Sequence, residues 1–164
     1  MRRTDLDQVA NALDGPMRQF VREARVRVAL LVNRSGQVMV QHGFTHRYEV
    51  IEIASLVAAA NAAAGALAEM TGAGRWTHLH HAGRVRELVL APVSTPSEPL
   101  ILAAVFEEDS SLGLVQLYID QLAADVAALP EMRTPTPTSD PVAFERDLEA
   151  GLDRLFGPDT AVEG

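Results

Sequence analysis

The sequence predicts an α+β domain built on one five-stranded antiparallel sheet, with strand order 2-1-5-4-3 and helices on its faces. Three observations support this class. A hairpin-like pair of segments comes first, three more strand-like segments follow a long helix, and two of the five segments, 26–33 and 100–106, are almost entirely apolar. Strands apolar on both sides lie where both faces of a sheet are covered, so these two should be central neighbours.

The N-terminal elements are a helix and a hairpin. Apolar residues recur at helical spacing over 5–23, although Gly15-Pro16 should bend or break that helix. The β-branched segment 26–33 and the alternating segment 37–41 flank Arg34-Ser35-Gly36, which has the composition of a turn. We therefore expect a bent or interrupted helix followed by a β-hairpin.

A long helix over about 50–70 carries no charge between Glu52 and Glu69 and should end at Gly72 and Gly74. One stripe at helical spacing should face the core, and it consists of Ile53, Leu56, Val57, Ala60, Ala64 and Leu67. The opposite face should be bare, and it consists of Ser55, Ala58, Ala62 and Ala66. Small side chains let another protein approach the backbone closely, so we interpret the bare face as a docking surface.

The remaining elements complete the domain. Segments 76–82 and 85–93 flank Gly83-Arg84 as a second hairpin, 100–106 is the fifth strand, and 111–129 is an amphipathic helix. The domain should therefore span 1–129. A proline-rich linker over 130–141, an amphipathic helix over 142–157 and a tail over 158–164 should follow. That last helix needs a groove, on this subunit or on a partner.

Composition excludes several classes of function. The net charge of −8 argues against nucleic-acid binding, which depends on Lys and Arg. The chain has no cysteine, so disulfides and thiolate metal sites are excluded, and a cytoplasmic location fits. No apolar segment follows the basic start of the chain as in a signal peptide, and the apolar run 53–68 is shorter than the roughly 20 residues that a bilayer needs. We expect no membrane insertion.

Signatures of catalysis are missing from the sequence. It contains no phosphate-binding glycine motif, no H-E-x-x-H and no G-x-S-x-G. His78 and His80 would share a strand face and could hold zinc with a third ligand, but a polar edge strand or a self-pairing dimer surface is the stronger interpretation. Arginines 34, 84 and 86 are interpreted as solvated turn residues rather than arginine fingers. The acidic run 107–109 should be a solvated loop before a helix. We expect no active site and no cofactor or metal.

Several strings, in their order along the chain, resemble the Roadblock/dynein light chain family. They are ALLVNRSGQVMV at 29–40, SLVAAANAAAGALAEM at 55–70, LILAAVF at 100–106 and SLGLVQLYIDQL at 111–122. The resemblance covers about residues 6–129. Within the family, the chain is most similar to the bacterial MglB-type group, whose members regulate the Ras-like GTPase MglA in cell polarity or motility.

The resemblance implies a homodimer in which the third strands pair edge to edge and the two bare helices lie side by side. Trp76, His78 and His80 would then belong to the dimer interface. It also implies that the dimer binds a Ras-like GTPase and stimulates GTP hydrolysis without an arginine finger of its own. The positions matching the family's docking face are Ala58, Ala59, Ala62 and Ala66. Two alternatives are a non-catalytic scaffold or adaptor and a small-molecule sensor domain.

Overall fold

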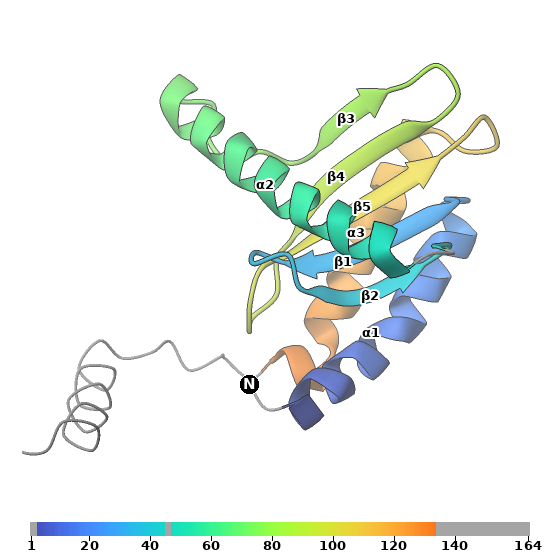
Figure 1. Cartoon of the computed structure of the whole chain (residues 1–164), viewed down its shortest axis with the longest axis vertical. Coiled ribbons are helices and arrows are strands. Elements are labelled where there is room, and N and C mark those ends of the chain that lie inside the picture. The colour runs from blue at the N-terminus through green and yellow to red at the C-terminus, as the bar shows by residue number, and fades with distance from the viewer. Residues whose placement is uncertain (1–2, 45–46, 134–164) are drawn as a thin grey trace, which may run out of the picture. The chain divides into compact units, whose positions relative to one another are not determined.

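A computed structural model describes residues 3–44 and 47–133 and contains an open antiparallel sheet between two helical layers (Figure 1). Its elements in chain order are α1 (Arg3–Glu23), β1 (Val28–Asn33), β2 (Val38–His42), α2 (Arg47–Thr71), β3 (Leu79–Ala82), β4 (Glu87–Val93), β5 (Leu100–Phe106), α3 (Leu112–Ala128) and the 3₁₀ turn η1 (Pro130–Met132). The linker from residue 134, the predicted helix 142–157 and the tail lie outside the described residues.

The sheet has the predicted strand order, β2-β1-β5-β4-β3, and every pairing is antiparallel. β1 and β5 lie side by side at its centre, with Val28 opposite Val105 and Asn33 opposite Leu100. Leu30 and Leu31, successive residues of β1, are both fully buried although their side chains point to opposite faces. Both faces of the central strands are therefore covered, as their composition indicates.

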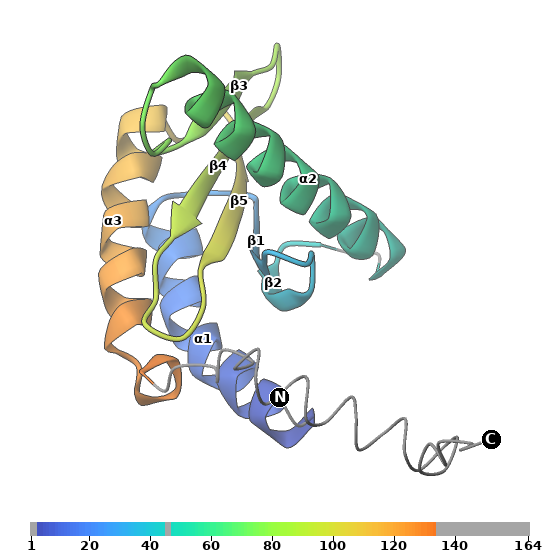
Figure 2. The same ribbon diagram turned by 90° about the vertical axis from the view of Figure 1, so that its left-hand side faces the viewer.

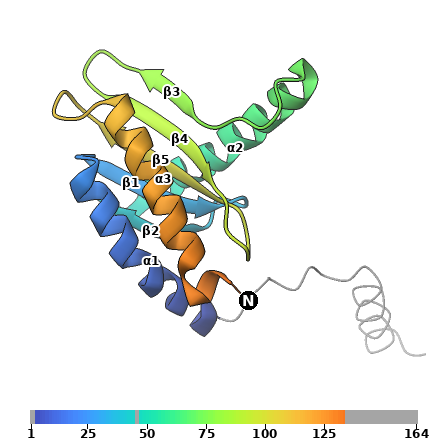
Figure 3. The ribbon, with the colours of Figure 1, turned by 180° about the vertical axis from the view of Figure 1, so that it is seen from behind.

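Two hydrophobic cores lie on the two faces of the sheet. α1 and α3 cover one face, and α2 crosses the other (Figures 2 and 3). The first core includes Leu13 and Met17 of α1 and Phe106 of β5, all fully buried. The second is smaller and includes Leu30 of β1, Ile101 of β5, and Ala54 and Val57 of α2. α2 is thus attached to the sheet through few side chains.

α1 is one continuous helix that includes Pro16, so the predicted break at Gly15-Pro16 is wrong, and the predicted bend stays a prediction. Proline costs a helix one backbone hydrogen bond and crowds the preceding turn. Leu13 and Met17, on either side of it, are both 0% exposed. Their packing against the sheet holds the helix together where local preference would interrupt it.

α2 ends as predicted, at Gly72. The amide of Ala73 donates to the carbonyl oxygen of Ala68 at 3.0 Å, and that of Gly72 donates to Glu69 at 3.3 Å. Gly72 itself has φ +66°, the left-handed conformation that glycine adopts without penalty. This pair of bonds is the Schellman motif, which satisfies carbonyl groups that the helix end leaves open.

Two element boundaries differ from the prediction in ways that matter. β3 begins at Leu79, so Trp76 and His78 precede it. Pro130–Met132, assigned to the linker, form η1, and Met132 is 1% exposed in the first core. The amide of Ser97, in the β4–β5 loop, donates to the carbonyl oxygen of Met132 at 3.0 Å. The folded domain therefore includes η1, and the residue that leads out of it is fixed beside that loop.

Candidate protein-interaction surface

The outer surface of α2 carries large apolar side chains, and between Glu52 and Glu69 it has no charge. Ile53, Leu56 and Leu67 are 36%, 69% and 62% exposed, and Met70 is 85% exposed. At about 100° per residue these four positions lie within one stripe of the helix. We call this set the apolar stripe: Ile53, Leu56, Leu67 and Met70. Exposed large hydrophobic side chains gathered on one helix indicate a surface made to contact another protein.

This stripe corrects the predicted core face. Ile53, Leu56 and Leu67 do not face the core, whereas Val57 and Ala64 do, and Ala60 is half-buried. The observed core face of α2 is centred on Val50, Ala54, Val57 and Ala64. It is rotated about 60° from the prediction. Because α2 is apolar on every side, hydrophobic periodicity does not determine which side meets the sheet, and the small side chain of Ala54 allows the closest approach.

The second exposed surface of α2 is the small-residue face, formed by Ala58, Ala59, Ala62 and Ala66. Ala59, Ala62 and Ala66 are exposed, and Ala58 is half-buried. The β1–β2 turn lies against Ala58, because a Cβ placed on Gly36 would be 3.6 Å from its methyl group and 3.4 Å from the carbonyl oxygen of Ala54. Part of the small-residue character of α2 is therefore needed inside the domain.

An open groove of about 920 Å³ runs between the small-residue face and the β4–β5 loop. Ala58, Ala62 and Ala66 line one side of it, and Ser94 and Pro99 line the other. The far end is closed by Arg75, whose guanidinium donates to Ser94 Oγ at 3.2 Å. Trp76 also lines the groove and packs, half-buried, against the second core. Sequence patterning did not predict this groove, because its second wall comes from a loop more than thirty residues away along the chain.

β3 forms an exposed edge of the sheet. Its four residues are all exposed, it pairs only with β4, and Leu79 is 40% exposed. His80 Nε2 lies 2.6 Å from Glu87 Oε2, and its ring stacks on Phe106 with centroids 6.4 Å apart. His78 is hydrogen-bonded to Gln116 of α3 at 2.9 Å. Within the described ranges, no group of three His, Cys, Asp or Glu residues is placed to hold a metal ion.

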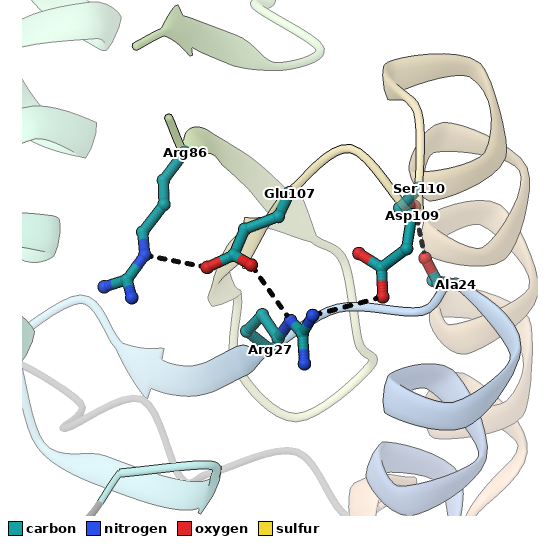
Figure 4. A network of polar contacts seen from close by, with 6 residues as sticks. All are labelled: Ala24, Arg27, Arg86, Glu107, Asp109 and Ser110. Carbon is teal, nitrogen blue, oxygen red and sulfur yellow. Dashed lines mark hydrogen bonds and ion pairs between the residues drawn. The ribbon is translucent and has the colours of Figure 1, made fainter. Parts of the chain in front are cut away.

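Arg86 and Glu107 belong to an ionic network at the surface of the domain (Figure 4). Glu107 lies between two arginines, with Oε1 2.9 Å from Arg86 Nε and Oε2 3.3 Å from Arg27 Nε. Arg27 also lies 3.5 Å from Asp109, and Ser110 Oγ donates to the carbonyl oxygen of Ala24 at 2.5 Å. The network joins the start of β1, the β3–β4 hairpin and the β5–α3 loop. The side chains of Arg86 and Asp109 are 70% and 50% exposed, so the predictions of a solvated Arg86 and a solvated acidic loop are confirmed, and the ion pairs are an addition that the sequence did not indicate.

A second hollow, of about 670 Å³, lies beside this network under the N-terminal part of α2. Val28, Leu88 and Ala103 of the sheet line it, and Ile53 forms part of its wall. Ile53 is therefore shared by the apolar stripe and this hollow, whose lining also includes Arg27, Arg86 and Glu107.

α2 is longer than the segment 53–68 indicates. Residues Glu49–Thr71 form one helix that is long and apolar enough to cross a membrane by length and composition, and 22% of its most apolar window is buried. Core helices of proteins that enter no membrane pass the same test. The absence of membrane insertion accordingly stays a prediction.

Comparisons with known proteins identify relatives of the whole domain. A family model described as Roadblock/LC7 domain matches residues 17–104. No curated protein sequence matches the chain. Among solved structures, MglB of Myxococcus xanthus is 27% identical with a TM-score of 0.62, and the match covers 73% of this chain and 92% of that one. The gliding protein MglB of Thermus thermophilus is 28% identical with a TM-score of 0.61, covering 71% and 87%. A structure described as MglB with tetrameric arrangement is 27% identical with a TM-score of 0.60, covering 77% and 90%.

Proposed function

Because the chain belongs to the Roadblock/LC7 family, we propose that it is a homodimeric regulator that binds a Ras-like small GTPase of the MglA type and stimulates its GTP hydrolysis. The similarity to MglB structures from two bacteria supports a place in an MglA system. The single observation that carries the proposal is the apolar, sparsely buried surface of α2.

The apolar stripe and the edge of β3 support the homodimer. Leu56 and Leu67 would pack against the same stripe of a second copy, as in other two-fold helix pairs. β3 offers unpaired backbone groups at the end of the sheet, and a second β3 would satisfy them. The C-terminal turns of α2 extend beyond the sheet (Figures 1 and 3), which leaves them accessible to a second copy. One two-fold axis would serve both contacts.

The small-residue face supports docking of the GTPase. Ala59, Ala62 and Ala66 are exposed and carry only methyl groups, so a partner can approach the helix backbone closely. The groove beside Ala62 and Ala66 adds a concave surface of the kind that receives a protruding loop or helix. This face lies on a different side of α2 from the apolar stripe, so dimer formation and docking would not compete for the same side chains.

The proposed regulator supplies no arginine finger, as the family resemblance implies. An arginine finger must be free to reach a partner's phosphate. Arg86 pairs with Glu107 and Arg75 donates to Ser94, whereas Arg34 is exposed and lines the groove. A regulator of this kind would accelerate hydrolysis by positioning the GTPase's own catalytic residues.

Phosphate release by a Ras-like GTPase of the MglA type tests the proposal. The wild-type domain at saturating concentration should raise the hydrolysis rate, and Ala62→Arg should abolish both binding and acceleration through steric clash and an unpaired charge. The matched control is Ala124→Arg, at an exposed alanine of α3 on the other face of the sheet. It should behave as wild type.

Three results would change the conclusion. Binding without any change in rate would replace the activator by a scaffold. If Ala124→Arg lost binding and acceleration to the same extent, the added charge alone would explain the loss. The small-residue face would then have no role in docking. Unfolding of Ala62→Arg, followed by circular dichroism, would show that Ala62 belongs to the core and would remove the docking surface itself.

A further inference from the structure

Histidines occupy the centre of the free edge of the sheet. β3 has four residues, and its two middle positions are His80 and His81. His78 lies immediately before the strand. β3 pairs with β4 on one side, with His80 opposite Val89 and His81 opposite Leu88. Its other side is unpaired within the described sheet.

Two-fold symmetry restricts how two copies of this edge can pair. Residues directly opposite each other in antiparallel strands point to the same face, so their sequence numbers must differ by an even number when the strands are identical. The two-fold axis must therefore pass beside a single residue. Its central choices are Leu79, His80 and His81.

Each of these three registers places imidazoles opposite one another. An axis at His80 sets His80 opposite its own symmetry mate, and an axis at His81 does the same for His81. An axis at Leu79 sets His78 opposite His80 of the second copy, twice by symmetry. An axis at Ala82, the last residue of β3, would instead set His81 opposite Gly83. Histidines therefore face each other in three of the four registers centred on a residue of β3.

We propose that protons control dimer formation at this edge: the homodimer is strong when the histidines are neutral and weakens when they become charged. The inference rests on the proposed homodimer and adds its regulation. Histidine is the side chain that ordinarily gains its charge between pH 8 and pH 5. Side chains directly opposite on neighbouring strands have Cβ atoms about 5 Å apart, and like charges at that distance destabilise the pairing.

The groups around the histidines reduce this repulsion without cancelling it. Glu87 of β4 faces His80, with Nε2 and Oε2 2.6 Å apart, so its negative charge lies beside any positive charge on that ring. Glu87 lies one strand further from the axis, so it is farther from the second copy's imidazole than the two imidazoles are from each other. On the α3 side, the neutral amide of Gln116 contacts His78, and the neutral ring of Phe106 stacks on His80.

Sedimentation equilibrium of the full chain tests the inference at pH 8.0 and pH 5.5, at constant ionic strength and with EDTA to remove metal ions. The dimer dissociation constant should rise by about tenfold at pH 5.5, the scale expected for like charges about 5 Å apart in a partly solvated edge. Replacing the three edge histidines together, H78N/H80N/H81N, should remove most of that change. The control His42→Asn, on β2 at the other end of the sheet, should keep it.

The outcomes separate this inference from the proposal on which it rests. A monomer at both pH values would overturn the homodimer and the inference with it. A dimer of equal strength at both pH values would overturn only the proton control. A pH effect that persists in the triple variant, or that disappears in His42→Asn, would also overturn it. Circular dichroism at pH 5.5 distinguishes dissociation from unfolding, and unfolding of the wild type there would count against the inference.

Discussion

Truncating Leu67 should weaken the homodimer and leave the folded protomer intact. Leu67 lies on the apolar stripe of α2 and is 62% exposed. The matched control is Leu117 of α3, which is also 62% exposed but lies on the opposite helical layer. The two substitutions Leu67→Ala and Leu117→Ala remove the same atoms from equally exposed positions, so only the proposed contact distinguishes them.

The expected magnitude follows from exposure and symmetry. Full burial of a leucine side chain contributes about 1.5–3 kcal/mol, so burying an exposed fraction of 62% contributes about 1–2 kcal/mol. A two-fold interface contains the residue twice, which gives about 2–4 kcal/mol for the dimer. At 1.4 kcal/mol per factor of ten, Leu67→Ala should raise the dissociation constant by about 30- to 700-fold.

Sedimentation equilibrium at pH 8.0 measures the dimer dissociation constant, and urea unfolding of the monomeric fraction measures the stability of the protomer. Leu117→Ala should leave both unchanged. The reasoning fails if the two variants weaken the dimer equally, or if Leu67→Ala leaves the constant within a factor of three of wild type. Truncating a buried leucine to alanine costs about 2 kcal/mol or more. A loss of protomer stability of that size in Leu67→Ala would show that Leu67 belongs to the core.

Three further predictions concern the stability of the domain. Glu107→Gln should lower the free energy of urea unfolding by about 1 kcal/mol because it weakens two arginine contacts, and this loss should shrink at high salt. The control Glu108→Gln changes an exposed side chain and should have no measurable effect. Gly43→Ala should destabilise the domain by more than about 2 kcal/mol, because Gly43 has φ +84° and an added Cβ would overlap a neighbouring backbone oxygen. Gly72→Ala should cost only about 1 kcal/mol in thermal unfolding, because Gly72 has φ +66° but an added Cβ would meet open space. A hydrogen bond from Arg18 lowers the pKa of the Asp14 carboxyl group below its usual value of 3.8, so the ionised carboxylate stabilises the fold above pH 3.8 and this stabilisation is lost as the pH falls below that value. Asp14→Asn should therefore lower the free energy of unfolding at pH 7 and change it less at pH 2.5. Equal losses at the two pH values would refute this.

The sheet could be predicted from the sequence because each of its strands is indicated by the composition of its own segment. The apolar segment 100–106 requires cover on both faces, which places β5 at the centre, and the observed strand has those bounds. Ser111 caps α3 by accepting from the amide of Leu114 at 3.2 Å, so that helix also begins where local chemistry sets it. These features need no knowledge of distant contacts.

The rotation of α2 depends on distant contacts and was predicted wrongly. Leu56 and Ala54 are both apolar, and only the position of the β1–β2 turn, close to Ala54 and Ala58, decides that Leu56 is excluded from the core. The ionic network was missed for the same reason. Arg27 and Glu107 are eighty residues apart, and neither has a sequence signal that distinguishes it from a solvated charge.

The shortness of β3 affects the risk of aggregation. An exposed edge strand can accept any extended chain, and four residues span only about 13 Å, which allows few backbone hydrogen bonds. Such an edge is too short to capture an unrelated strand firmly through its backbone alone. In the proposed homodimer, selectivity would then come from the side chains of α2, and β3 would set the alignment of the two copies. This arrangement would keep a sheet with an open end soluble at the low concentrations where its partner copy is absent.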